Sequence, residues 1–202
     1  MSDDFPRVSG LQLTPKDLYA LGTVIAHWAI AEMFITTHVY KLSLLTPNPA
    51  NRSKPIRQAF GRMREQWKTL LAEVCGANPQ YLKIGLALAS ASKVLKEDRD
   101  AAAHWPASRG DPQFDVPLKF VHLDIAKRTR KQKNFTPEEL LALAERIYQL
   151  GSDVNFFDFA MFCDLFPSQC TWHGPKPKGP ILRTHRFPTI EKPLRPQPTS
   201  RK

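Results

Sequence analysis

The chain has 202 residues, of which 42% are hydrophobic and 24% charged, and its formal net charge is +10. These values are ordinary for a globular protein, so one compact domain followed by a tail is the starting expectation. Three cysteines without a Cys-x-x-Cys pair, and the lack of an apolar N-terminal leader, exclude a disulfide-rich secreted scaffold. We therefore expect a cytoplasmic protein with reduced cysteines.

The stretch from Leu18 to Tyr40 is the most membrane-like part of the sequence, but it contains Glu32 near its middle. A carboxylate within a lipid bilayer costs roughly 2.5–3.5 kcal/mol. This stretch is therefore predicted to be a core helix of a soluble protein, with no membrane partner.

The C-terminal residues 171–202 hold eight basic residues, one acidic residue and seven prolines. Proline cannot continue a helix or pair within a central strand, so this segment is predicted to be a disordered, basic tail. The tail has two interpretations, an arm that binds nucleic acid through phosphates and a solubilising segment without a partner. The predicted organisation is a lead-in over 1–13, a helical domain over 14–170 and the tail.

Four helices are predicted in the domain. Thr14-Pro15 and Thr136-Pro137 are typical helix starts, with a hydroxyl N-cap followed by proline. Apolar residues recur in steps of three and four along all but the third segment. The sets are Leu18, Leu21, Ile25, Trp28, Ile35, Val39 and Leu42 in the first helix, Ile56 to Val74 in the second and Leu140 to Met161 in the fourth. The third helix is expected from Pro79 to His104, because Trp105 precedes Pro106.

These patterns predict an all-α protein, an antiparallel bundle of four to five helices. Between the third and fourth helices we expect a short hairpin or loop insertion, since apolar residues alternate from Leu118 to Ile125. A basic run ends this insertion, and its members are Lys127, Arg128, Arg130, Lys131 and Lys133. A run of this kind is either a solvated turn or a phosphate-binding element.

Most enzyme signatures are missing from the sequence, which has no phosphate-cradling glycine loop, no zinc helix and no nucleophile turn. Cys163, Cys170 and His173 supply three unevenly spaced ligands where structural zinc needs four. We therefore predict no cofactor and no metal. The remaining candidate is Arg99-Asp100-Ala101-Ala102-Ala103-His104, an arginine and a histidine near the end of the third helix. On its own this pattern is more typical of a histidine that caps a helix C-terminus than of a catalytic one.

With this motif the sequence resembles the HEPN family (higher eukaryotes and prokaryotes nucleotide-binding domains). The resemblance covers about residues 14–166 and rests on Leu21–Glu32, Arg99–His104 and Phe135–Leu140. Arg99 and His104 match the defining ends of the family motif, and Asp100 stands where the family usually has asparagine. The resemblance implies a helical bundle that dimerises so that two motifs face one another, and a metal-independent endoribonuclease, often a toxin or defence protein.

The residue types of the motif suit that implied chemistry, because histidine transfers protons near neutral pH and arginine stays charged beside phosphate. Five residues along a helix correspond to about 140°, so Arg99 and His104 of one chain are expected on different faces, which favours pairing of two chains. Asp100 lies one turn before His104 and is expected to hold its imidazole. Lys96, one turn before Arg99, is expected to supply a further phosphate contact.

Glu32 interrupts the apolar stripe of the first helix, and a carboxylate there needs a partner. We expect Glu32 to pair with Arg99 or a neighbouring basic residue, or else to meet solvent at the edge of the bundle.

The sequence thus predicts an endoribonuclease with His104 as general acid or base and Arg99 as the phosphate-stabilising cation. Its expected partners are RNA, a second copy in a homodimer, and an antitoxin or other protein. The alternatives are a non-catalytic HEPN-like module that binds RNA or a protein, and a dimeric scaffold.

Overall fold

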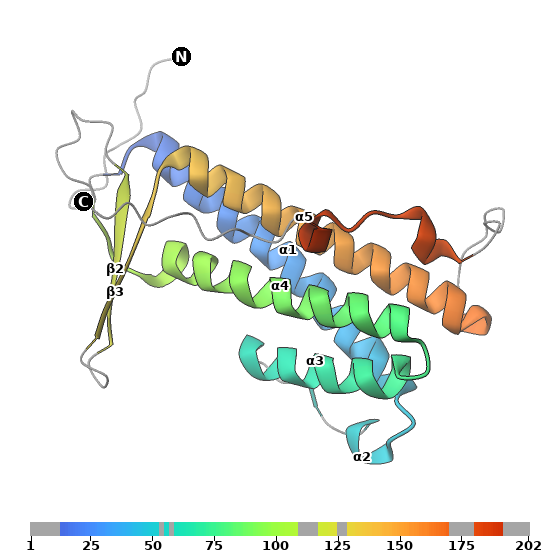
Figure 1. The fold of residues 1–202 in the computed structure, drawn as a ribbon. Coiled ribbons are helices and arrows are strands. Elements are labelled where there is room, and N and C mark those ends of the chain that lie inside the picture. The colour runs from blue at the N-terminus through green and yellow to red at the C-terminus, as the bar shows by residue number, and fades with distance from the viewer. Residues whose placement is uncertain are drawn as a thin grey trace. The chain divides into compact units, whose positions relative to one another are not determined.

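In a computed structural model of the chain, the described residues are 13–52, 55–56, 59–108, 117–124, 129–169 and 180–191. This part is mostly helical and includes one small sheet (Figure 1). The helices are α1 (Pro15–Leu45), α2 (Pro49–Arg52), α3 (Phe60–Cys75), α4 (Pro79–His104), α5 (Pro137–Leu165) and α6 (Pro188–Glu191). The strands are β1 (Ala107–Ser108), β2 (Leu118–Asp124) and β3 (Thr129–Phe135), and 3-10 helices cover Pro167–Gln169 and Ile181–Thr184.

Reciprocal side-chain caps begin the two longest helices. The Thr14 hydroxyl accepts the Asp17 amide at 3.2 Å, and the Asp17 carboxylate accepts the Thr14 amide at 2.8 Å. Thr136 and Glu139 form the same arrangement before α5. Each cap satisfies amides that the first turn of a helix leaves unpaired, so the predicted starts at Pro15 and Pro137 are confirmed.

The chain divides into two compact units. Unit one comprises Met1–Phe34 and Ser92–Gly151, and unit two comprises Ile35–Ala91 and Ser152–Lys202. The helices α1, α4 and α5 each contribute one part to either unit. The predicted single domain from 14 to 170 stays a prediction.

Unit one is built on close helix contacts. The buried face of its part of α1 consists of Ala20, Val24, Trp28 and Ala31. The His27 ring bonds through Nδ1 to the Ala144 carbonyl of α5 at 2.9 Å. A Cβ at Gly151 would lie 3.3 Å from the Ala31 Cα, so glycine lets α5 approach α1 closely.

The predicted apolar stripe is wrong for the first turns of α1, because Leu18 and Ile25 are 47% and 46% exposed. The core is contacted instead by Trp28 and by the smaller residues Ala20, Val24 and Ala31. Every exposed residue between Leu18 and Met33 is uncharged. We call this set the α1 apolar face, formed by Leu18, Tyr19, Gly22, Ile25, Ala26, Ala29, Ile30 and Met33. Within the described residues, α1 is also the one helix whose length and composition suit a membrane span.

The sheet of unit one has the antiparallel order β1-β2-β3. Leu118 and Phe120 of β2 are buried, and Phe120 faces Lys133 in the register with β3. The predicted hairpin is therefore confirmed. The basic run differs from the expected turn, because Arg130, Lys131 and Lys133 lie within strand β3. Figure 1 shows α4 leading directly into this sheet.

Unit two contains a buried ionic group on α1 and α5. The His38 side chain is fully buried, and its Nδ1 lies 2.8 Å from Oδ1 of Asp158. Lys41 pairs with the second oxygen of the same carboxylate at 2.5 Å. Burial raises the pKa of Asp158, but the hydrogen bond from His38 and the Lys41 ammonium outweigh it, so that the pKa lies below its usual range.

The prediction of a disordered tail is wrong for residues 180–191. Ile181, Leu182 and Phe187 are buried in unit two. The Asp164 carboxylate of α5 accepts the amides of Ile181 and Leu182 at 3.2 and 3.4 Å. Three apolar side chains and a carboxylate anchor thus order a proline-rich segment that composition alone marks as disordered. The rest of the predicted tail lies outside the described residues.

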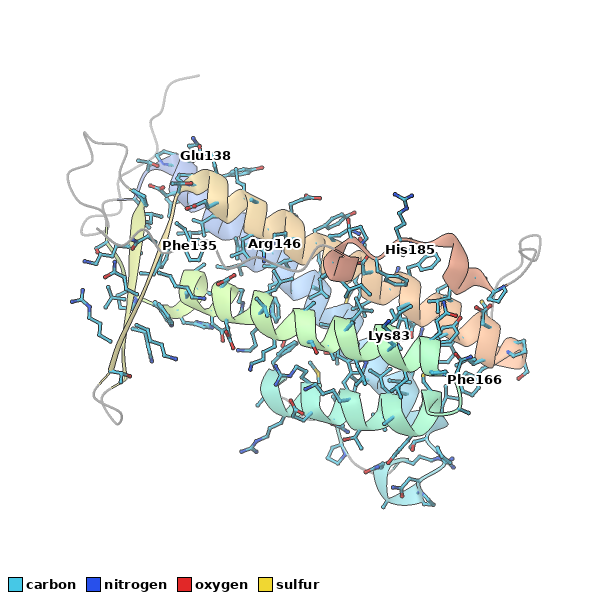
Figure 2. The ribbon with its side chains drawn as sticks, in the orientation of Figure 1. Lys83, Phe135, Glu138, Arg146, Phe166 and His185 are labelled. Carbon is cyan, nitrogen blue, oxygen red and sulfur yellow. The ribbon has the colours of Figure 1, made fainter. Side chains whose placement is uncertain are left out.

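A second anchor for this segment is Asp153, whose carboxylate accepts the Thr189 amide at 3.1 Å and lies 3.3 Å from Nε2 of His185. The His185 ring also stacks on Phe156, with 4.0 Å between the ring centroids. Figure 2 labels His185 on the segment that follows α5.

The cysteines differ from the sequence expectation, because Cys163 is disulfide-bonded. Cys75 is free and buried, and burial raises the pKa of its thiol to about 11. An odd number of cysteines is therefore compatible with one bond, since Cys75 is a core side chain.

We predict that Asp158→Ala lowers the free energy of unfolding by about 3 kcal/mol at pH 7, because it leaves the buried His38 without its partner. The lowered pKa of Asp158 means that its contribution is complete above the ordinary carboxyl pKa of about 4 and is lost as the pH falls below it. Urea denaturation at several pH values measures both effects. Glu65→Ala, at an exposed ion pair with Arg64, is the control and should change stability far less.

Candidate active site at the end of α4

Local pairing fixes the C-terminal end of α4. The Trp105 amide still donates to the Ala101 carbonyl at 3.2 Å, after which Pro106 ends the helix. The Pro106 carbonyl accepts the Val121 amide of β2, and β1 pairs with β2 from Ala107 onward. His104 therefore stands exposed on the last turn, between the helix and the sheet.

Arg99 is the centre of the site. Its guanidinium carbon lies 5.5 Å from the centre of the Trp28 ring, within the range of a cation–π interaction. Nη1 donates to Oδ1 of Asp100 at 3.0 Å and lies 3.2 Å from Nε2 of His104. The buried Nε has no partner among the described residues. One side chain thus touches an aromatic ring, a carboxylate and an imidazole.

The expectation that Arg99 and His104 of one chain stay apart is wrong, because the two side chains meet at 3.2 Å. The rotation of 140° describes the Cα positions only. The long arginine side chain extends along the last helical turn and reaches the imidazole despite that rotation.

The expected role of Asp100 also needs correction. Its carboxylate accepts from Lys96 and Arg99, and within the described structure no hydrogen bond or ion pair joins it to His104. Side chains of a helix lean toward its N-terminus, so Asp100 leans toward Lys96 rather than toward His104. Asp100 therefore pairs with the cations Lys96 and Arg99, and it is Arg99 that contacts the histidine.

Glu32 is half-buried on α1, and its Oε2 accepts the indole N–H of Trp28 at 2.7 Å. The expected ion pair with Arg99 is not found in the described part of the chain. Instead, Glu32 and Arg99 both contact Trp28, one at the indole N–H and the other over the ring. Glu32 therefore orients the indole on which Arg99 rests.

The basic strand lies beside this helix end. Lys133 of β3 forms an ion pair at 2.5 Å with Asp98, the residue before Arg99. Lys131 and Arg130 are exposed on the same strand. The structure thus brings one cation of the predicted basic run, Lys133, next to the predicted motif. Lys127 and Arg128 lie outside the described residues.

Sequence reasoning missed Arg146 of α5, which Figure 2 labels on the helix that begins near Glu138. Burial lowers the pKa of this guanidinium, although the charge of Asp98 opposes that shift. Its Nε is buried without a partner among the described residues. No sequence signal marks this arginine, because it lies about forty positions from the motif. Which way its side chain faces depends on how α5 packs, and the sequence pattern does not show that.

The charges of the site nearly balance. Lys96 and Arg99 share Asp100, and Lys133 is paired with Asp98. An entering phosphate must therefore compete with two carboxylates for these cations. Within the described ranges, no group of three or more His, Cys, Asp or Glu side chains is arranged to hold a metal ion. The chemistry that the site offers is proton transfer by an exposed imidazole beside a guanidinium.

Comparison with known proteins adds no family assignment, since no family model, curated protein or solved structure matches the chain.

We predict that the neutral His104 ring carries its proton on Nδ1. A guanidinium can only donate, so the contact with Arg99 requires Nε2 to be the acceptor. Imidazole ¹⁵N shifts measured at alkaline pH report this tautomer, and Arg99→Ala should move the proton toward Nε2. His122, which has no hydrogen-bond partner among the described residues, is the internal control. A wild-type spectrum with Nε2 protonated would contradict the contact.

Proposed function

We propose that the end of α4 is the active site of a metal-independent endoribonuclease. The observation that carries this proposal is the contact of 3.2 Å between an exposed imidazole and a guanidinium within one chain. His104 is the general acid or base, and Arg99 stabilises the charge that develops on the phosphate. Lys96 and the basic residues of β3 bind the neighbouring phosphates.

The proposed reaction is an attack of the RNA 2′-hydroxyl on its own phosphorus. The 2′ oxygen loses a proton and bonds to phosphorus, while the bond from phosphorus to the 5′ oxygen breaks and that oxygen gains a proton. The products are a 2′,3′-cyclic phosphate and a 5′-hydroxyl. His104 performs one of the two proton transfers, and a second copy of the site offers the other.

Phosphate binding and proton transfer are coupled in this arrangement. In the unbound site Arg99 occupies the Nε2 lone pair of His104. Arginine binds phosphate through charge-assisted bonds that are stronger than a bond to neutral imidazole. Phosphate therefore draws Arg99 away and frees Nε2 to accept a proton.

The finer architecture that we propose is a HEPN-like antiparallel bundle in a homodimer. Because Arg99 and His104 already meet in one chain, the site itself does not require a second chain to join them. The α1 apolar face supports the homodimer instead, since it exposes Tyr19 by 68% and Met33 by 54% without any charged residue. Exposed apolar surfaces of this kind mark interaction sites in soluble proteins.

We further propose a toxin or defence role in the cytoplasm, with an antitoxin or other protein partner, from the resemblance of residues 14–166. An oxidising compartment is the alternative location, and the disulfide at Cys163 favours it, because such bonds persist mainly in oxidising compartments.

The alternative function is a non-catalytic module that binds RNA or a protein. The pairing of both Lys96 and Arg99 with Asp100 favours this alternative, because the negative charge weakens the stabilisation available to a phosphorane-like transition state.

We predict that His104→Ala lowers RNA cleavage by 10²–10⁴-fold, because it removes the proton-transfer group. Arg99→Ala should lower it by about 10²–10³-fold through lost charge stabilisation. Cleavage is measured on a labelled RNA with a chelator present, and the cyclic phosphate is detected by mass spectrometry. Glu97→Ala, an exposed change on the same helix, is the control and should leave the rate near that of the wild type.

Wild-type protein that binds RNA without cutting it would establish the non-catalytic alternative. Cleavage that disappears with the chelator would rule out the metal-independent reaction.

We predict that Ile25→Asp, on the α1 apolar face, shifts the protein from dimer to monomer, because it places a charge in the centre of the proposed interface. Sedimentation velocity over a concentration series measures the change. Ala142→Asp, at an exposed position of α5, is the control and should leave the dimer intact. A wild-type protein that sediments as a monomer at every concentration would refute the homodimer.

A further inference from the structure

An aromatic pair follows the candidate site directly. Trp105, the residue after His104, stacks on His122 of β2, with 5.4 Å between the ring centroids and 21° between the ring planes. Trp105 is half-buried and His122 is exposed. The imidazole surface that Trp105 does not cover is therefore accessible to solvent.

The strand pattern explains why His122 occupies this position. Leu118 and Phe120 of β2 are buried, and alternation along a strand places His122 on the same side of the sheet. The buried side chains end with Phe120, and Trp105 provides the next apolar contact. His122 thus extends the inner face of the sheet to its solvent-exposed edge.

A cation lies next to the pair. Lys131 of β3 is the cross-strand partner of His122 in the register of the sheet. Side chains that face each other across two strands lie about 5 Å apart at Cβ. Lys131 is exposed and has no ion-pair partner among the described residues, whereas Lys133 on the same strand is paired with Asp98.

We propose that Trp105, His122 and Lys131 form a binding site for one unpaired nucleotide. The base stacks on the accessible surface of His122 and extends the existing stack, while Lys131 binds the phosphate of the same nucleotide. Histidine and tryptophan are among the side chains on which proteins stack splayed RNA bases. The site deepens the proposed function, on which its biological meaning rests, because it places a flanking nucleotide beside His104.

A stacking site distinguishes unpaired from paired nucleotides, because a base within a duplex is already stacked on both faces. A surface that attracted RNA by charge alone would bind both forms, and its affinity would depend on the salt concentration but not on His122. Preference for a single strand, combined with dependence on His122, is therefore the signature of this site.

The test uses the full chain and a 2′-O-methylated RNA, which cannot be cleaved, as a single strand and as a duplex of the same sequence. Fluorescence anisotropy gives the Kd for each. We expect the wild type to prefer the single strand and His122→Ala to weaken that binding by about 5- to 100-fold. His122→Phe, which retains an aromatic ring, should restore most of the affinity.

Lys131→Ala should reduce the salt dependence by about one phosphate contact and keep the single-strand preference. Asn134→Ala, at an exposed position on the opposite side of β3, is the matched control. Equal affinity of wild type and His122→Ala, equal binding of both RNA forms, or no RNA binding at all would each overturn the proposal. Because the probe cannot be cut, these results are independent of whether His104→Ala abolishes cleavage.

Discussion

The half-buried guanidinium of Arg99 is the constraint on which the candidate site depends. A charged group in such a place needs several compensating contacts, since its desolvation is costly. Arg99 finds them in the Trp28 ring, the Asp100 carboxylate and the His104 imidazole. Glu32 fixes the indole, and the sheet fixes the helix end. The position of the exposed histidine follows from this set of contacts.

Local chemistry made the helix boundaries predictable. Threonine caps followed by proline marked the starts of α1 and α5, and Trp105-Pro106 marked the end of α4. The side of α1 that meets the core was not predictable, because this helix is apolar on nearly all sides. That choice depends on small residues such as Ala31, which approaches Gly151 of another helix. Periodicity in one segment carries no information about such a partner.

The residues of the site were found only in part. The motif pointed to Arg99 and His104, because their types suit phosphate chemistry, but spacing along an ideal helix misjudged their contact. The length and the direction of the side chains decide which groups touch, and neither follows from the number of residues between two positions. Arg146 and His122 enter the region from α5 and β2. In the tail, the many prolines predicted disorder, although Ile181 and Phe187 are buried and anchor part of the segment.

The carboxylate of Asp100 has a consequence for any polyanion that meets this surface. By holding Lys96 and Arg99 at rest, it acts as a built-in counter-ion that an incoming strand must displace. A phosphate that contacts the site only briefly then gains little binding free energy. A strand that is held longer by neighbouring contacts can displace the carboxylate from the two cations. Under the proposed function, the selectivity for RNA would then depend on residence time rather than on attraction at a distance.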